Sequence, residues 1–439
     1  MASEVDSGAS VGSVRYFTLV CPQCGATAPG DTTQFRCACG TPFDLPDAAF
    51  GCSCVAAEEL RARFHKRLSM PGGSPRSGVW RYRELVLPLA DEHIVSRQEG
   101  NTPLYGVGAS ERSGWRKIGE YAGLERLFLK HEGENPTGSF KDRGMTIGMS
   151  VAHELGVRAV ACASTGNTAA SLAAYAAQAG LPALVFLPGN KVSSGKLAQS
   201  IAYGARRVEV AGDFDDAMRQ VEVVAGQLGI YLLNSINPYR LAGQRSIGYE
   251  LLQQLDWQPP DWIVLPAGNL GNTAAIGAAL LRAAALGLIS RVPHIAAVQA
   301  TGADPFYRSF ASAWREFAPV HASTRATAIS IGAPVSYTRA RAVIEATGGV
   351  VTEIGDDEIF TAKACIDRAG IGCEPASAAS VAGVRRLVAE GTIAPDAQVV
   401  AVLTGHLLKD VEQVTGEVQI GEQTEVDGLL REIHGALCA

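Results

Sequence analysis

The sequence predicts an α/β protein with parallel sheets flanked by helices, preceded by a small cysteine-rich segment. Three observations lead to this prediction. From residue 127 onward, short apolar runs alternate with segments of helical periodicity, which is typical of parallel sheets covered by helices on both faces. The chain has 439 residues, 47% of them hydrophobic, so two or three globular parts are expected. Six of the ten cysteines fall between Cys21 and Cys54, which sets the N-terminal segment apart.

The cysteine-rich segment is the first element along the chain. It holds two close cysteine pairs, Cys21 with Cys24 and Cys37 with Cys39. Two such pairs, separated by a short turn-rich stretch, can surround one tetrahedral Zn²⁺ with four thiolates. We therefore expect residues 1–56 to form a zinc-ribbon-like segment in which these four cysteines bind the metal. Cys52 and Cys54 are alternative ligands. The alternative is a metal-free segment that only packs on the main body.

Eight apolar runs in the body of the chain predict buried strands, because each is short and rich in aliphatic residues. These runs are 127–130, 159–163, 183–187, 207–210, 230–233, 262–265, 295–298 and 399–403. Helical patterns lie between them, at 168–178, 214–227, 242–255, 273–286, 358–368 and 377–390. Residues 303–337 show weaker periodicity and are expected to be rich in loops. Ligands of such sheets bind beyond the carboxyl ends of the strands, so the turns that follow the strands are the candidate sites.

The first of these turns contains Lys141, in the stretch ENPTGSFKDRG at 134–144. The Asn, Pro and Gly residues predict a turn and the following residues an amphipathic helix, so Lys141 is expected near a helix N-terminus. The positive end of a helix disfavours an ammonium and lowers the pKa of the amine. A neutral lysine amine can form a Schiff base with an aldehyde. Taken alone, the pattern also fits a solvated lysine paired with Asp142.

Two further turns are suited to anions. The stretch 164–168 (STGNT) follows a predicted strand and opens an alanine-rich helix, so its hydroxyl, amide and backbone N–H groups can bind a carboxylate or a phenolate oxygen. An ordinary helix cap is the alternative. The stretch 266–273 (PAGNLGNT) also lies between a strand and a helix. Its glycines let the backbone approach a phosphate closely, and the helix start supplies N–H donors.

A fourth turn, Thr404-Gly405-His406, follows the last predicted strand. The Thr404 hydroxyl can cap this turn or hydrogen-bond a ring nitrogen. We interpret His406 as incidental, because no partner for it is evident. These four features match the functional groups of pyridoxal 5′-phosphate. The Lys141 amine suits its aldehyde, the turn at 164–168 its phenolate oxygen, the glycine turn at 266–273 its phosphate, and the Thr404 hydroxyl its pyridine nitrogen. The combination predicts that cofactor and outweighs the separate structural explanations.

The overall charge excludes several classes of partner. The formal net charge is −6 and no basic run is present, so neither nucleic acid nor an anionic membrane is an expected partner. The first twenty residues lack a basic start followed by an apolar stretch, and the longest apolar helix, around 274–289, is interrupted by Arg282. We expect a cytoplasmic protein that does not enter a membrane, with its cysteines in a reducing compartment.

From about Ser77 onward the chain resembles the fold-type II pyridoxal-phosphate enzymes, which belong with the tryptophan synthase β-like proteins, and within them the threonine synthases. The ENPTGSFKDRG stretch is highly specific for this group, whereas the glycine turn is shared more widely. The matching segments are 77–82, 134–144, 163–171, 196–199, 234–240, 268–272, 374–380 and 403–405. The resemblance implies a two-domain catalytic region at 57–439, with a smaller subdomain at about 134–230 inserted in the larger one.

The resemblance also implies roles for individual residues. Lys141 would carry the cofactor, Asn167 would contact its phenolate oxygen, and Thr404 would face its pyridine nitrogen. The cofactor phosphate would be bound by Gly268, Asn269, Leu270, Gly271 and Asn272. The substrate carboxylate would be bound by Ser164 and Thr168, and the substrate phosphate by Asn234, Ser235 and Arg240 with help from Asn269. Arg240 is suited to this role because a guanidinium offers a forked set of donors to phosphate oxygens.

These residues would convert O-phosphohomoserine and water into threonine and phosphate by γ-elimination followed by β-addition, with a homodimer as the common assembly. The stretch 330–336 (SIGAPVS) and Leu407 depart from the pattern of many relatives, and both lie on the substrate side. The alternatives are therefore a paralogue that uses another phosphorylated amino acid, such as a cysteate synthase-like enzyme, and a catalytically silent protein that binds the cofactor.

Overall fold

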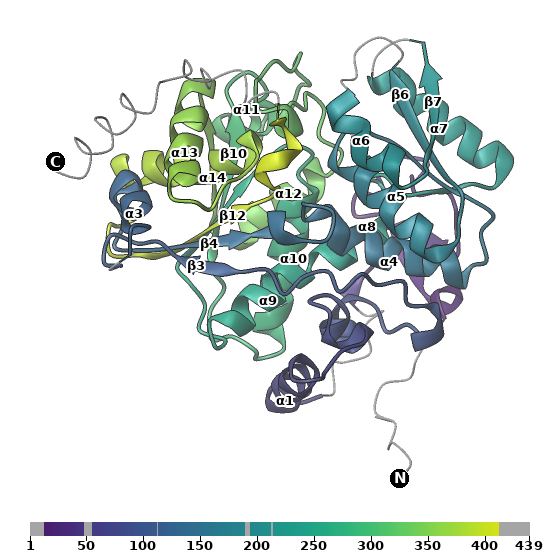
Figure 1. Ribbon diagram of the computed structural model, residues 1–439, viewed down its shortest axis with the longest axis horizontal. Helices are drawn as coiled ribbons and strands as arrows, with labels where there is room; N and C mark the ends of the chain where they lie inside the picture. Colours follow the sequence, from purple (N-terminus) through teal and green to yellow (C-terminus); the bar gives the residue numbers. More distant parts are fainter. Residues whose placement is uncertain (1–12, 48–54, 112, 189–193, 212–213, 412–439) are drawn as a thin grey trace, which may run out of the picture.

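Two separate sheets, each flanked by helices, form the body of the protein (Figure 1). The structure is a computed structural model that describes residues 13–47, 55–111, 113–188, 194–211 and 214–411. In Figure 1 the part built on the six-stranded sheet lies on the left and the part built on the four-stranded sheet on the right. The predicted arrangement of parallel sheets flanked by helices is confirmed.

The larger sheet has the strand order β11-β10-β9-β12-β4-β3. All of its neighbouring strands are parallel except β3 and β4. Its strands are β3 (Leu104–Gly106), β4 (Arg126–His131), β9 (Trp262–Pro266), β10 (His294–Ala300), β11 (Val350–Ile354) and β12 (Gln398–Leu403). The helices of this part are α2 (Arg83–Val86), α3 (Arg116–Ala122), α9 (Ser246–Gln254), α10 (Gly271–Ala285), α11 (Pro305–Ala311), α12 (Tyr337–Ala346), α13 (Asp356–Arg368) and α14 (Pro375–Ala389).

Alternate residues of the central strands enter two different cores. In β12, Val400 and Val402 join one apolar cluster, whereas Val399, Ala401 and Leu403 join the other. This follows from the strand period of two, which sends successive side chains to opposite faces. Both faces are covered by helices, which is why the strands are nearly continuous apolar runs and could be recognised in the sequence.

The smaller sheet has the order β7-β6-β5-β8, with every pair parallel. Its strands are β5 (Val160–Ala163), β6 (Ala183–Pro188), β7 (Arg206–Val210) and β8 (Tyr231–Leu232). The helices of this part are α4 (Lys141–Glu154), α5 (Asn167–Ala179), α6 (Ser194–Ala202), α7 (Phe214–Leu228) and α8 (Pro238–Gln244).

Some elements of the structure differ from the prediction. The strands β3 and β11 were not predicted. A single helix was expected at 242–255, but α8 and α9 meet at Arg245, and α8 begins earlier, at Pro238. The side chain of Asn237 caps α8 by accepting the N–H of Tyr239 at 3.0 Å, and a proline at the first helical position is compatible with this start. Residues 303–337 contain α11 and one short 3₁₀ turn and are otherwise irregular, as expected.

The N-terminal segment packs against both parts of the body. It contains the small hairpin of β1 (Thr18–Val20) and β2 (Thr27–Pro29), and helix α1 (Ala57–Leu68) follows it. On the smaller-sheet side, Arg36 pairs with Glu222 of α7 at 3.4 Å. On the larger-sheet side, Arg339 of α12 donates to the carbonyl of Pro42 at 3.0 Å. Among the described residues, no helix is both long and apolar enough to cross a membrane.

Candidate active site

The turn before α4 lies against the segment that follows β12, and this contact brings Lys141 beside Thr404. The N–H of Phe140 donates to the carbonyl of Thr404 at 3.0 Å, and the N–H of His406 donates to the carbonyl of Gly138 at 2.9 Å. Gly138 has a φ of +85°, a conformation that a glycine adopts without strain. Helix α4 begins at Lys141, so the predicted position of this lysine at a helix start is confirmed.

The turn is closed by Asp142, which is fully buried. Its carboxylate accepts hydrogen bonds from the Thr137 N–H at 2.7 Å, the Thr137 hydroxyl at 2.6 Å and the Ser171 hydroxyl at 2.6 Å. Burial raises the pKa of Asp142 to about 6, although these donors oppose the shift. The carboxylate therefore joins the turn to α5 by hydrogen bonds. It is not the surface partner of a solvated Lys141.

The environment of Lys141 favours its neutral amine. Its Nζ lies 4.3 Å from the centre of the Phe140 ring. The pKa of Lys141 is lowered to about 7, mainly by removal from water and also by the positive charge of Arg240, while Glu374 acts in the opposite direction. The lowered pKa expected from the helix end thus has burial as its leading cause in the structure. An amine with a pKa near neutrality can act as a nucleophile or a base at physiological pH.

Arg240 reaches this region because α8 packs very closely on α4. A Cβ on Gly144 would lie 2.6 Å from the carbonyl oxygen of Arg240, and one on Gly243 would lie 2.0 Å from that of Arg143. Glycine is thus required at both contacts. Arg240 is 1% exposed, and its Nη1 donates to the carbonyl of Leu233 at 3.0 Å.

Two donors of Arg240, Nε and Nη2, are buried without a hydrogen-bond partner. Burial lowers the pKa of Arg240 to about 10. A buried charge that lacks partners is costly, and an anion would satisfy both donors. These unpartnered donors are the strongest indication of an anion site near Lys141.

Asn167 and Thr404 lie on either side of one carboxylate, which belongs to Glu374. Asn167 Nδ2 donates to Glu374 Oε2 at 2.9 Å, and Thr404 Oγ1 to Glu374 Oε1 at 3.0 Å. The structure therefore brings together two side chains that the sequence places 237 positions apart. Glu374 was not singled out from the sequence. The signals for it were its place at the start of the matching segment 374–380 and its position as an acidic residue directly before a helix that starts with proline.

The glycine turn at 268–272 connects β9 to α10, as predicted. Gly271 begins α10, and Leu270 precedes it with a φ of +63°. Several buried polar atoms around this helix start have no partner, namely both side-chain polar atoms of Asn272, Thr273 Oγ1 and Ser336 Oγ. A phosphate at the helix start would satisfy such groups. The residues present thus fit a phosphate group.

The remaining residues expected to contact the substrate differ in whether their side chains already hydrogen-bond to other protein groups. Asn269 Nδ2 donates to the hydroxyl of Ser235 at 3.3 Å, so these two lie together. The side chain of Asn234 is taken up by the backbone of Ala163, with which it makes two hydrogen bonds of 2.9 Å. Ser164 accepts the N–H of Gly166 at 3.2 Å. Thr168 is buried in the first turn of α5.

His406 has a structural contact of its own. Its Nδ1 accepts the N–H of Leu408 at 3.1 Å and caps the short 3₁₀ turn Leu407–Lys409. The partial burial of the ring lowers its pKa, so the imidazole is neutral at pH 7. This contact agrees with the interpretation of His406 as incidental to catalysis.

The four cysteines expected to bind zinc lie together. Their sulfurs are all within 4.8 Å of one another, and two of the distances, Cys21–Cys39 and Cys24–Cys37, are 3.5 Å. A tetrahedral Zn²⁺ with Zn–S bonds of about 2.3 Å separates its sulfurs by roughly 3.8 Å. The arrangement therefore fits one zinc ion. Cys52 and Cys54, the expected substitutes, lie outside the described residues.

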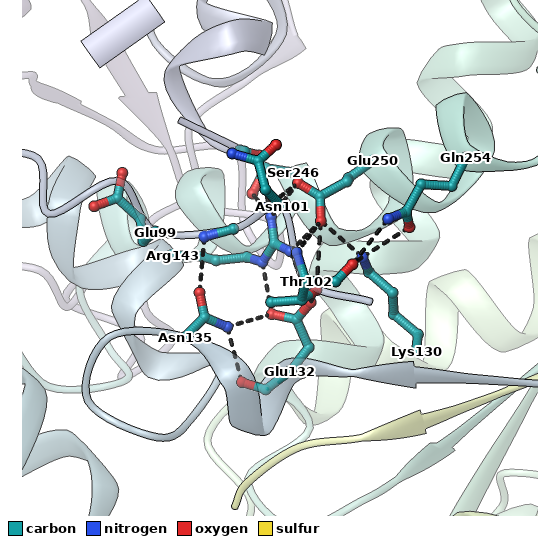
Figure 2. A network of polar contacts seen from close by, with 12 residues as sticks. Glu99, Asn101, Thr102, Lys130, Glu132, Asn135, Arg143, Ser246, Glu250 and Gln254 are labelled. Atoms are coloured by element: carbon teal, nitrogen blue, oxygen red, sulfur yellow. Dashed lines mark hydrogen bonds and ion pairs between the residues drawn. The ribbon is translucent and has the colours of Figure 1, made fainter. Parts of the chain in front are cut away.

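Beneath the turn that carries Lys141 lies a network of buried charges (Figure 2). Arg143 binds Glu132 and Glu250, and Glu250 in turn binds Lys130 at 2.7 Å. Asn135, in the same turn, donates to Glu132 at 2.9 Å and accepts the Gly100 N–H at 2.8 Å. Sequence reasoning missed this network, because its members come from four distant segments.

The sequence is similar to a family of known enzymes. Residues 95–405 match the family model described as pyridoxal-phosphate dependent enzyme. A curated threonine synthase of Methanosarcina acetivorans is 42% identical over 96% of this chain and 98% of its own length. That of Methanocaldococcus jannaschii is 44% identical over 89% of this chain and 92% of its own.

Solved structures with the same fold are more distant in sequence. The processed threonine deaminase isoform 2 from Solanum lycopersicum has a TM-score of 0.62 at 21% identity and covers 80% of this chain and 95% of its own. Maize serine racemase has a TM-score of 0.60 at 20% identity and covers 82% of this chain and 97% of its own. At these identities the likeness shows the fold alone.

Proposed function

Since this chain belongs to the family of pyridoxal-phosphate dependent enzymes, we propose that it is a threonine synthase that converts O-phospho-L-homoserine and water into L-threonine and phosphate. The identity of 42–44% to curated threonine synthases over nearly the whole chain supports this activity. One structural observation supports the proposed activity most directly. Arg240 is a buried cation close to Lys141, and two of its N–H donors, Nε and Nη2, have no hydrogen-bond partner. A substrate without a second anionic group would leave these donors unsatisfied.

Four groups of the chain are suited to holding the cofactor. Lys141 supplies the amine for its aldehyde, the turn at 268–272 the N–H donors for its phosphate, Asn167 the amide for its phenolate oxygen, and Thr404 the hydroxyl for its pyridine nitrogen. The cofactor supplies, when bound, the sink for the electron pair that remains when a proton leaves the substrate. The unpartnered polar atoms around the start of α10 support this assignment.

Lys141 is the group that moves protons. With a pKa of about 7, its amine is substantially neutral at physiological pH and can take the proton from Cα of the substrate. The same amine then takes a proton from Cβ as phosphate leaves from Cγ, and it returns a proton to Cγ. Water adds its hydroxyl at Cβ, and the return of a proton to Cα completes threonine. A base works best when its pKa lies near the operating pH, and burial gives Lys141 that property.

Arg240 binds the leaving phosphate of the substrate. Its free Nε and Nη2 point in the fixed geometry of a guanidinium, which matches two phosphate oxygens. Ser235 and Asn269, which are hydrogen-bonded to each other, complete this site. Ser164 and Thr168, at the start of α5, bind the substrate carboxylate. Asn234 contributes by holding the end of β5 through Ala163.

A steady-state assay tests the proposal. With O-phosphohomoserine, purified protein should release phosphate and threonine in equal amounts, and Lys141→Ala protein should release neither. O-Phosphoserine with sulfite is the matched alternative substrate. Cysteate formation without threonine would assign the chain to the paralogous reaction, and no product from either substrate would favour a silent cofactor-binding protein.

We further propose that the N-terminal segment, residues 1–56, is a structural zinc module, that residues 134–230 form the smaller subdomain, and that the protein is a cytoplasmic homodimer. The four clustered sulfurs support the zinc, and the separate four-stranded sheet supports the subdomain. Light scattering on the purified protein measures the oligomeric state directly.

A further inference from the structure

Glu374 is a buried carboxylate that joins the two side chains assigned to the cofactor ring. It is 4% exposed, and its two oxygens accept from Asn167 at 2.9 Å and Thr404 at 3.0 Å. The carboxyl group lies so close to Gly405 that a Cβ there would come within 2.5 Å of both oxygens. Its position is therefore fixed, yet none of the reaction steps described above uses it.

The hydrogen bonds around Ser377 determine where its own proton goes. Ser377 Oγ accepts the backbone N–H groups of Thr404 at 2.8 Å and of Gly405 at 3.0 Å. A hydroxyl has two acceptor positions and one donor, so both acceptor positions are taken. Its proton is then directed to Thr404 Oγ1 at 3.0 Å, because the other acceptor, the Gly405 carbonyl, is 3.4 Å away.

Thr404 Oγ1 thus accepts from Ser377 and has one proton and one acceptor position left. When Glu374 is ionised, the Thr404 proton must go to Glu374, and the hydroxyl can only accept a hydrogen from a third group. When Glu374 carries a proton, it donates to Thr404, and the Thr404 proton is free for a third group. One hydroxyl therefore cannot donate to an ionised Glu374 and to a ring nitrogen together.

We propose that Glu374 is a positioning residue that shares one proton with the pyridine nitrogen of the bound cofactor through the Thr404 hydroxyl. This inference rests on the proposed function, in which Thr404 faces that nitrogen. With the proton on Glu374 the nitrogen accepts from Thr404, and with the proton on the nitrogen Thr404 donates to Glu374. Each of these two forms satisfies every hydrogen-bonding group in the chain from Ser377 to the ring.

The charges that face Glu374 come from the elements packed around it. Lys141 at the start of α4 and Lys409 in the turn after β12 favour its ionised form, and so do the hydrogen bonds from Asn167 and Thr404. Cys373, the preceding residue, is a buried thiol whose pKa is raised by burial, so it stays neutral. Burial of Glu374 outweighs the favourable contacts and raises its pKa, which lets the carboxyl retain a proton at a higher pH than an exposed one.

Nitrogen NMR of the holoenzyme, loaded with cofactor that carries ¹⁵N in the ring, tests the inference. In the wild-type protein, raising the pH should remove the shared proton and turn Thr404 toward Glu374, so the ring signal should shift. In Glu374→Gln protein the amide oxygen faces Asn167 and the amide nitrogen donates permanently to Thr404. The ring signal should then stay at the position of an unprotonated nitrogen, without that step. A pH-dependent shift of the ring signal that occurs in both proteins reports titration of the bond between the cofactor and Lys141.

Thr404→Val removes the hydroxyl while keeping the shape of the side chain, and it serves as the second variant. The Glu374-dependent step should be absent in this protein, and adding Glu374→Gln should change nothing further. An equal effect of Glu374→Gln with and without the Thr404 hydroxyl would mean that the charge of Glu374 acts directly on the ring, which overturns the relay. Identical titration curves for wild-type and Glu374→Gln protein would also overturn it.

The failure of this inference can be told apart from a failure of the proposed function. A protein that carries the cofactor on Lys141 and releases threonine, but whose ring signal is insensitive to residue 374, overturns the shared proton alone. A protein that does not link the cofactor to Lys141 at all overturns both.

Discussion

Arg143 is bound to Glu132 by two hydrogen bonds that connect the end of β4 to the first turn of α4. Arg143 Nε lies 2.6 Å from Glu132 Oε2, and Nη2 lies 2.7 Å from Oε1. Both side chains are fully buried, and Figure 2 shows Arg143 in the middle of the network with Glu132 below it. Because Arg143 is two residues beyond Lys141, this pair fixes the two ends of the turn that presents the lysine.

Breaking this pair should destabilise the protein strongly. Glu132→Gln leaves the Arg143 guanidinium buried without its full complement of acceptors, and loss of one partner of a buried ion pair costs about 3–5 kcal/mol. Urea unfolding should report this loss as a lower midpoint. The control is Glu358→Gln, which removes an exposed pair with Arg386 at 2.8 Å and should cost at most about 1 kcal/mol. Equal losses in the two variants would contradict the role of the buried network.

Lys141→Ala should abolish covalent attachment of the cofactor. Reduction with borohydride followed by mass spectrometry of tryptic peptides measures the attachment at each lysine. Lys409→Ala is the matched control, because Lys409 also lies near Glu374 and has a pKa lowered by burial. It should retain the attachment. Cofactor bound covalently in Lys141→Ala protein would contradict the assignment.

The attachment should also depend on pH in a defined direction. The pKa of Lys141 is lowered from 10.5 to about 7, so the nucleophilic neutral amine predominates above about pH 7 and is lost as the pH falls below it. The rate at which apoprotein takes up the aldehyde should therefore rise with a midpoint near pH 7. Arg240→Gln removes a positive charge that lowers this pKa, so its midpoint should move to higher pH. An unchanged midpoint would show that Arg240 does not influence the amine.

Arg240 should matter most for substrates that carry a phosphate. A hydrogen bond to a charged group contributes about 1.5–3 kcal/mol, so Arg240→Gln should lower kcat/KM for O-phosphohomoserine roughly 10- to 150-fold. Arg240→Lys keeps the charge but loses the forked donors, and an intermediate value is expected. Inhibition by inorganic phosphate should weaken in the same order. Undiminished phosphate inhibition in Arg240→Gln protein would place the anion site elsewhere.

The cysteine cluster should bind one zinc ion per chain. Cys24→Ser removes one of four ligands and should reduce the zinc content measured by mass spectrometry of the metal, with a lower thermal stability. Cys365→Ser is the control, because Cys365 is a free cysteine outside the cluster. It should retain the metal. A zinc content near zero in carefully prepared wild-type protein would leave the segment as a metal-free module.

The success of the strand predictions has a physical cause. In β9, β10 and β12 both faces are buried, so most positions are apolar and the runs are easily recognised. β3 and β11 are at the two edges of the larger sheet. Edge strands need fewer apolar side chains, and β3 has no fully buried residue at all. β3 is only three residues long, and in β11 Thr352 and Glu353 interrupt the apolar run, so neither pattern was recognised.

The sequence by itself determined the chemistry that each turn can offer. The lysine at a helix start, the glycine turn before α10 and the hydroxyl after β12 depend on local propensity and on residue type, and both can be read over a few positions. Only the tertiary structure decided which of these groups meet. Glu374 lies between Asn167 and Thr404, and Asn234 is taken up by Ala163. Such contacts join residues separated by 30 to 207 positions. Burial, which is the main cause of the lowered pKa of Lys141, exists only once those segments have packed together.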